Sequence, residues 1–233
     1  MAKRLVLWDV DHTLIATRGV GREAFAGAFE RVTGRPLVEQ AEITGRSELI
    51  IFRETLALHG LPRDLVDFPT YTQALAAEYT RRAVDLRERG HALPGAAAAL
   101  DALAQEPGVV QAPGTGNVRP VAEIKLQVFN LDRHLNFDEG GYGEDAEARA
   151  DMIMVALGRA GVDASKAIIF GDTVADVEAG LATGVFVAGV ATGRTSAQAL
   201  TEAGANTVLA GLEDTGRIVQ LVRGLGAGGR QAS

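Results

Sequence analysis

The sequence contains no cysteine, which excludes disulfides, thiolate metal sites and a cysteine nucleophile. Histidine is also scarce, and the four histidines (His12, His59, His91 and His134) are too scattered to form a zinc site. Long apolar segments are missing too, and the first apolar run, which is short, begins after only four residues. We therefore expect neither a signal peptide nor a membrane span, and a cytoplasmic location is the default expectation.

Positive charge is in deficit, because 23 Lys and Arg stand against 30 Asp and Glu and the formal net charge is -7. Binding to nucleic acid depends on clustered Lys and Arg, so we expect no nucleic-acid partner. A phosphate-bearing ligand would need local positive charge instead. With 233 residues and 47% hydrophobic content, the chain can bury a sizeable core. The composition indicates an ordered globular protein, either a monomer or a homodimer.

Short apolar runs alternate with helical patterns along most of the chain. The apolar runs predict strands at 5–8, 109–112, 166–170, 185–190 and 207–209. The helical spacing predicts helices over 94–104, 119–130, 146–160, 196–203 and 213–225. Alternation of this kind predicts an α/β fold, with a doubly wound, mostly parallel, Rossmann-like sheet and right-handed crossovers.

The segment that follows the first strand departs from this alternation. Helical patterns cover 24–32, 48–59 and the stretch from Pro69 to Gly90, with no strand between them. We therefore predict an all-helical cap domain over 16–90, inserted into an α/β core domain formed by 1–15 and 91–225. The glycine-rich tail, 226–233, is expected to be disordered. Both ends of the insertion should emerge at the carboxyl side of the sheet, so the cap should lie over that edge.

Polar residues follow three of the predicted strands. Asp9 and Asp11 follow the first strand, Thr115 follows the second, and Asp172 and Asp176 follow the third. The carboxyl ends of parallel strands form one edge of a sheet, where ligands bind in open α/β folds. Several carboxylates without thiolates or a histidine cluster suit a hard cation with oxygen ligands, such as Mg²⁺.

Three motifs, in this order, resemble those of the haloacid dehalogenase-like superfamily of phosphohydrolases. They are Asp-Val-Asp-His-Thr-Leu from Asp9, Thr115-Gly116-Asn117, and Gly-Asp-Thr-Val-Ala-Asp from Gly171 to Asp176. The resemblance covers about 5–190, and the helical insertion is similar to the cap of phosphoglycolate phosphatase-like members. It implies a Mg²⁺-dependent phosphoric monoester hydrolase that acts on a small phosphorylated metabolite through an aspartyl-phosphate.

The resemblance also implies a role for each matched residue. Asp9 would be the nucleophile, and Asp11 would protonate the leaving oxygen and later activate water. Thr115, with Gly116 and Asn117, would bind the phosphate. The implied magnesium ligands are Asp9, the backbone carbonyl of Asp11, Asp172 and, in support, Asp176.

The chain departs from the family pattern at several positions. The basic residue of the third motif has no clear counterpart, and Arg149 is our first choice for it and Lys125 the second. His12 stands where the family usually has glycine. Pro113 interrupts an otherwise apolar strand and removes a ladder donor, which bears on the placement of the second motif. In capped relatives a loop placed like that of Arg46 faces the substrate, so Arg46 could contact the leaving group.

Two other functions stay open on the sequence alone. One is a phosphomutase of the same superfamily, which returns the phosphoryl group to a sugar. The other is a catalytically weakened protein that binds a phosphorylated ligand or has a regulatory role. Intact Asp9, Asp11 and Asp172 argue against the second alternative. The sequence does not identify the phosphorylated substrate, because a fold does not fix the molecule on which it acts.

Overall fold

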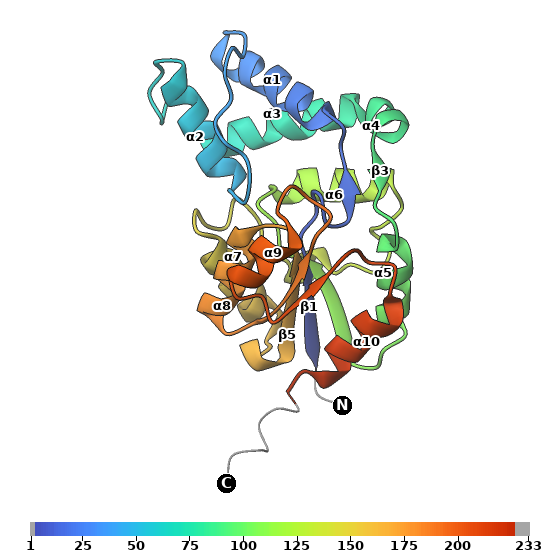
Figure 1. Cartoon of the computed structure of the whole chain (residues 1–233). Helices are drawn as coiled ribbons and strands as arrows, with labels where there is room; N and C mark the ends of the chain where they lie inside the picture. The colour runs from blue at the N-terminus through green and yellow to red at the C-terminus, as the bar shows by residue number, and fades with distance from the viewer. Residues whose placement is uncertain (1–2, 227–233) are drawn as a thin grey trace.

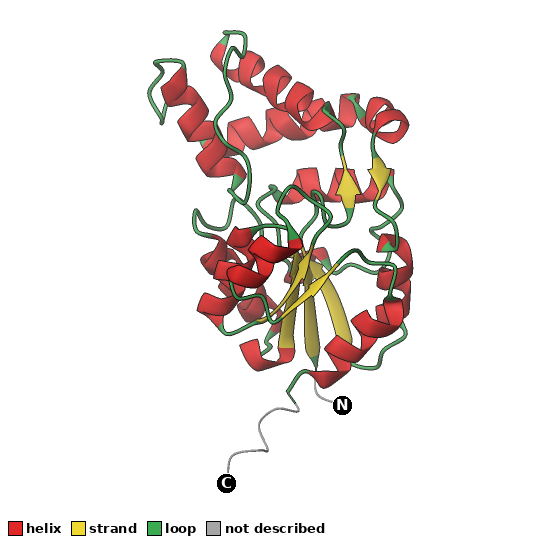
Figure 2. Ribbon diagram, in the orientation of Figure 1, coloured by secondary structure: helices red, strands yellow, loops and turns green. Residues whose placement is uncertain are grey.

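The computed structural model describes residues 3–226, and its centre is a five-stranded parallel sheet with the order β4-β1-β5-β6-β7 (Figures 1 and 2). The strands are β1 (Arg4–Trp8), β4 (Val109–Pro113), β5 (Ala167–Gly171), β6 (Phe186–Val190) and β7 (Thr207–Leu209). The predicted fold class is confirmed. Most of the tail predicted to be disordered lies outside the described residues.

Helices cover both faces of the sheet, which explains why its strands are apolar runs rather than alternating patterns. Val6 and Trp8 of β1 join a core cluster with α5 (Ala96–Ala104), α6 (Arg119–Val128) and α10 (Thr215–Gly224). Leu5 and Leu7 face the other way, toward α7 (Arg149–Ala160), α8 (Val174–Thr183) and α9 (Ala197–Glu202). Two short 3-10 turns, η1 (Phe137–Glu139) and η2 (Ala164–Lys166), complete this half. The sheet is therefore doubly wound.

The segment between β1 and α5 forms a helical block above the carboxyl ends of the strands (Figure 1). Its helices are α1 (Val20–Thr33), α2 (Glu48–Leu58), α3 (Phe68–Arg81) and α4 (Ala83–Arg89). The two connections to the rest of the chain, β2 (Ile15–Ala16) and β3 (His91–Ala92), pair as antiparallel strands. The block has its own apolar cluster, which also includes Val118, Val121 and Val128 at the start and along one side of α6.

The prediction of one long third helix was wrong, because α3 and α4 are separate helices that meet at Arg82. The backbone of Arg82 leaves the helical region at φ -96° and ψ 13°, and the turn carries the fully buried Leu86 into the cluster of the helical block. No glycine or proline occurs at this bend. Tertiary packing overrides the local helical pattern here.

Pro113 does not disturb the sheet. Strand β4 is an edge strand with β1 as its one ladder partner. The N–H of Gly114 donates to the Trp8 carbonyl (2.8 Å), whereas the Pro113 carbonyl accepts from Gly141 on the opposite side (2.9 Å). In a parallel ladder the N–H and C=O of one residue point to the same side, so the missing N–H of Pro113 does not face β1. Thr115 therefore follows β4 at the edge where the sequence predicts it.

Candidate active site

The ends of β1 and β5 bring three carboxylates together at the edge below the helical block. Asp9 follows β1 and extends its pairing, since its N–H donates to the Phe170 carbonyl (2.9 Å). Asp172 follows β5, and Asp176 lies in the first turn of α8. One oxygen from each of the three lies within 4.8 Å of the others, and all three residues are buried.

Asp176 is fully hydrogen-bonded within the protein. Its Oδ2 accepts from the Thr173 hydroxyl (2.7 Å) in a capping box that starts α8, and its Oδ1 accepts from Arg149 Nε (2.6 Å). This geometry gives Asp176 a supporting position, because both of its oxygens already have donors.

Asp172 has the opposite environment. No donor among residues 3–226 forms a hydrogen bond to its carboxylate, and Gly193 packs so closely that a Cβ there would lie 1.7 Å from Asp172 Oδ2. Burial, together with the charges of Asp9 and Asp176, raises the pKa of Asp172 far above its ordinary value. A buried carboxylate with acidic neighbours and no donor is destabilising unless a cation compensates it. Oxygen donors of this kind fit Mg²⁺.

Arg149, the first residue of α7, lies between two of these acids. Its Nη2 donates to Asp9 Oδ1 (2.8 Å) and to the Gly114 carbonyl (3.2 Å), while its Nε binds Asp176. Burial raises the pKa of Asp9, and the Arg149 charge opposes that shift without cancelling it. Arg149, the first choice for the basic residue of the third motif, is thus in direct contact with Asp9.

Lys125 lies at the same site but binds the other aspartate. Its Nζ donates to Asp11 Oδ2 and to Asn117 Oδ1, both at 2.6 Å, and its side chain is buried. Asn117 Nδ2 also donates to Asp11 Oδ2 (2.8 Å). Burial on its own would raise the pKa of Asp11, but the charge and hydrogen bond of Lys125, with the bond from Asn117, lower it below its ordinary value. Each of the two basic candidates therefore binds a different aspartate: Arg149 binds Asp9, and Lys125 binds Asp11.

The Thr115-Gly116-Asn117 loop lies beside Asp11. The Thr115 hydroxyl is buried and accepts from Asn117 Nδ2 (2.9 Å), so its own proton remains available to a ligand. Gly116 passes directly beneath the helical block: a Cβ there would lie 2.3 Å from the Arg46 carbonyl. Only glycine allows this approach.

Two further positions that the sequence singles out are His12 and Arg46. His12 is exposed and adopts a left-handed conformation (φ 62°), which explains why glycine suits this position. Its carbonyl accepts from the Thr192 hydroxyl (2.5 Å). The Arg46 side chain forms an ion pair with Glu54 on α2, and its backbone carbonyl, rather than its guanidinium, packs against Gly116.

The sequence interpretation missed Glu48, Tyr71 and Tyr79. Glu48 opens α2 and bonds through its N–H to the Gly116 carbonyl (2.9 Å), and its side chain accepts from the Tyr71 hydroxyl (2.8 Å). The ring of Tyr79 lies 5.1 Å from Lys125 Nζ. On the sequence, Glu48 is an ordinary first-turn acid and the tyrosines are helix-face residues, so no local signal marked them.

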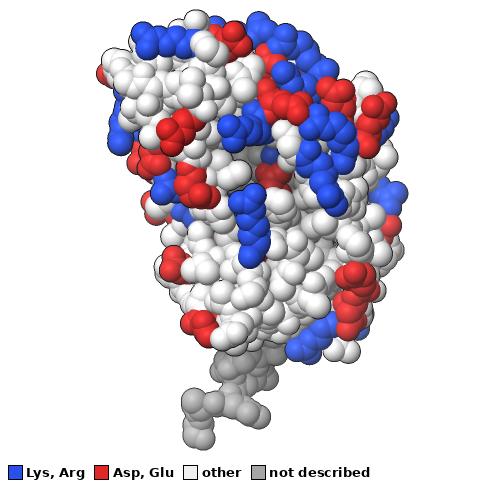
Figure 3. Space-filling view, turned by 45° about the horizontal axis from the view of Figure 1, so that its top comes forward, with Lys and Arg blue, Asp and Glu red and all other residues white. Residues whose placement is uncertain are grey.

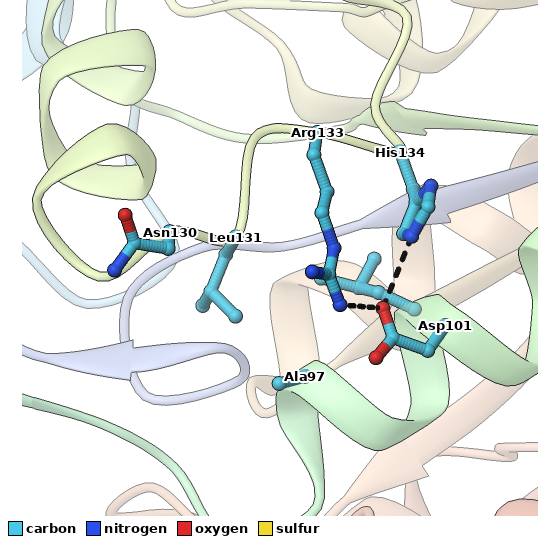
Figure 4. A pocket seen from close by; sticks show the side chains of 7 residues that line it. Ala97, Asp101, Asn130, Leu131, Arg133 and His134 are labelled. Atoms are coloured by element: carbon cyan, nitrogen blue, oxygen red, sulfur yellow. Dashed lines mark hydrogen bonds and ion pairs between the residues drawn. The ribbon is translucent and has the colours of Figure 1, made fainter.

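The hollow between the helical block and the sheet half can be seen in the space-filling view, with basic side chains around it and an acidic side chain inside (Figure 3). A separate small pocket lies between α5 and the loop after α6 (Figure 4). There Asp101 binds Arg133 and His134 Nε2 (3.0 Å). This pocket contains none of the predicted site residues, and its acid already has partners.

Comparisons with known proteins show the family and the fold of the chain. The family model described as haloacid dehalogenase-like hydrolase matches residues 3–184. No curated protein matches the sequence. A solved hydrolase from Pseudomonas syringae aligns with a TM-score of 0.67 at 19% identity, covering 94% of this chain and 99% of its own. A predicted phosphatase from Clostridium acetobutylicum gives 0.66 at 18% identity, with 94% and 100% coverage.

A third solved structure, a protein from Thermotoga maritima provisionally assigned as a beta-phosphoglucomutase, has a TM-score of 0.60 at 19% identity and covers 94% of this chain and 99% of its own. At these identities the likeness concerns the fold alone. Within residues 3–226, no helix has both the length and the apolar character needed to span a membrane.

Proposed function

Because the chain belongs to the haloacid dehalogenase-like hydrolases, we propose that it is a Mg²⁺-dependent phosphatase of a small phosphorylated metabolite. The observation that carries the proposal is the pairing of Asp9 with Arg149 beside the uncompensated Asp172. Burial disfavours a negative Asp9, and the charge and hydrogen bond of Arg149 oppose this effect and favour the negative form, which is the state that a carboxylate nucleophile needs. The vicinity of Asp172 has the charge that a divalent cation would balance.

In the proposed reaction, an Asp9 carboxylate oxygen attacks phosphorus while the bond from phosphorus to the leaving oxygen breaks. Asp11, which has to carry a proton at this stage although Lys125 and Asn117 favour its ionised form, donates that proton to the leaving oxygen, so the leaving alcohol departs neutral. Asp11 then takes a proton from water, and the water oxygen attacks phosphorus and releases Asp9 and inorganic phosphate. The Thr115 hydroxyl and the backbone of Gly116 and Asn117 would bind the phosphate oxygens.

Asp9, the Asp11 carbonyl and Asp172 would hold Mg²⁺, with Asp176 supporting them through Arg149. When bound, the ion neutralises charge between a carboxylate nucleophile and a phosphate. Arg149 performs part of the same task from the protein, because its guanidinium already touches Asp9 and can turn toward a phosphate oxygen.

The helical block, 16–90, is proposed as a cap domain that excludes water from this reaction. Three contacts between the block and the core half support this proposal. The Glu48 N–H binds the Gly116 carbonyl, Gly45 packs against Ala175, and Arg53 forms an ion pair with Glu147. The paired connections β2 and β3 link the block to the core half, and we propose that they act as its hinge.

The covalent step is tested by exchanging each aspartate separately. Nitrophenolate leaves without protonation, so Asp11→Asn should still phosphorylate Asp9 but hydrolyse the product slowly, by a factor of ~10²–10⁴. Intact-protein mass spectrometry after mixing with nitrophenyl phosphate and Mg²⁺ should show a phosphorylated species in Asp11→Asn and none in Asp9→Asn. Phosphorylation of Asp9→Asn, or turnover by it near that of the unmodified protein, would refute the mechanism. A strict requirement for a bisphosphate activator would instead indicate the phosphomutase.

A further inference from the structure

The helical block contributes a carboxylate, that of Glu48, next to the Thr115-Gly116-Asn117 loop. Glu48 is the first residue of α2, and its N–H is bound to the Gly116 carbonyl, directly over the proposed phosphate loop. Burial raises the pKa of Glu48 above its ordinary value, and the hydrogen bond from Tyr71 and the charge of Lys125 oppose that shift without cancelling it. Glu48 therefore lies at the junction of the helical block with the proposed phosphate loop.

A buried tyrosine holds this carboxylate in place. The Tyr71 hydroxyl donates to Glu48 Oε1 (2.8 Å), and the Tyr71 ring is fully buried and stacked on Phe52 with ring centroids 3.7 Å apart. Among residues 3–226, no donor forms a hydrogen bond to the second oxygen, Oε2. Glu48 is half-buried, so that oxygen is a fixed acceptor available to a ligand.

The basic side chains around this space are already paired with acids. Arg149 binds Asp9 and Asp176, Lys125 binds Asp11, and Arg46 binds Glu54. The site has two basic groups that bind its acids, Arg149 and Lys125. It has five carboxylates, which are Asp9, Asp11, Glu48, Asp172 and Asp176. A Mg²⁺ ion and a phosphate dianion cancel each other, so the excess of carboxylates over basic groups remains, and Glu48 is the member of this set that comes from the helical block.

We propose that Glu48, held by Tyr71, binds the leaving alcohol, and that the substrate is a phosphate ester of a small alcohol carrying ammonium or hydroxyl groups. A carboxylate or a second phosphate on that alcohol is disfavoured. This assignment rests on the proposed phosphatase function. The physical reason is that a donor satisfies Glu48 Oε2, whereas a negative group placed at hydrogen-bond distance from that oxygen would be repelled, and we expect a loss of at least about tenfold in affinity.

A matched set of two-carbon esters tests the assignment: 2-aminoethyl phosphate, 2-hydroxyethyl phosphate and 2-phosphoglycolate, which differ only in the terminal group. For the unmodified protein with Mg²⁺, kcat/KM should be at least about tenfold higher for the first two than for phosphoglycolate. In Glu48→Gln the ratio of the ammonium to the carboxylate ester should fall about tenfold, and in Tyr71→Phe it should fall less. Glu39→Gln makes the same charge change at an exposed position of the block and should keep the ratio.

Preference of the unmodified protein for phosphoglycolate would overturn the assignment, and so would a ratio that stays within about twofold in Glu48→Gln. The preference for or against phosphoglycolate is measured on the unmodified protein alone, so this result does not depend on whether a variant folds. Nitrophenyl phosphate hydrolysis by the same preparation tests the phosphatase function separately from the role of Glu48. Its absence refutes the phosphatase function, whereas its presence without discrimination among the esters refutes only the role of Glu48.

Discussion

Gly116 is the position where the closed cap depends most directly on the absence of a side chain. A Cβ at Gly116 would lie 2.3 Å from the Arg46 carbonyl oxygen, roughly 1 Å short of van der Waals contact. The opposing atom belongs to the backbone, so it cannot rotate away as a flexible side chain would. We expect Gly116→Ala to be accommodated by a displacement of the cap of about 1 Å, and a misplacement of this size can reduce activity by about 10²-fold.

Gly158→Ala is the matched control. Gly158 lies in α7, and a Cβ there meets no atom within 4 Å. Alanine should therefore stabilise the helix by roughly 0.5–1 kcal/mol and leave activity unchanged. The assays are kcat/KM with 2-hydroxyethyl phosphate and thermal unfolding. We expect the loss of kcat/KM in Gly116→Ala but not in Gly158→Ala. If Gly116→Ala keeps kcat/KM within about threefold, the closed contact is not the working state.

Two further changes address the metal site and the second basic residue. The raised pKa of Asp172 means that the folded protein binds its proton more tightly than the unfolded chain, so metal-free protein should lose stability as the pH rises above the ordinary range of a carboxyl. In chelator, Asp172→Asn should therefore raise the melting temperature by about 2–4 °C or more, with a larger gain near pH 8 than near pH 5, while activity falls and recovers partly in excess Mg²⁺. Lys125→Met removes the partner of Asp11, and we expect alkyl phosphate hydrolysis to fall by ~10²-fold or more while phosphorylation by nitrophenyl phosphate falls less.

Each of these has an outcome that contradicts it. Full activity of Asp172→Asn in chelator would remove Asp172 from the metal site, and a melting-temperature gain that is equal at both pH values would show that its charge is not the cause. An equal loss with both classes of ester in Lys125→Met would mean that Lys125 supports the fold of the site rather than the position of Asp11. Circular dichroism of each variant separates that case from unfolding.

The sequence by itself determined the fold class and the edge of the sheet where the acids lie. Strand β1 is buried on both faces, because helices cover both sides of the parallel sheet. Its sequence is therefore a continuous apolar run, which predicts a strand without a structure. Asp9 and Asp172 directly follow their strands, and parallel strands end at one edge. The helical block was also predictable, because helical periodicity persisted with no strand inside it.

Local pattern could not determine where a helix bends under tertiary packing. The separation of α3 from α4 at Arg82 carries no glycine or proline, and it follows from the burial of Leu86 among the other helices of the block. The same cluster draws in Val121 of α6, so the apolar surface of the block continues into the core half of the chain. The periodicity of a single helix in the sequence does not predict such long-range contacts.

Only the tertiary structure decided how the charged side chains are partnered. Arg149 and Lys125 looked like alternatives for one role, yet they come from different helices and bind different aspartates. Glu48 looked like a helix-start acid until the folded chain placed it over Gly116 and against Tyr71. A charge acts through distance in space, and sequence separations of more than 100 residues, such as that between Lys125 and Asp11, leave no trace of that distance in the local pattern.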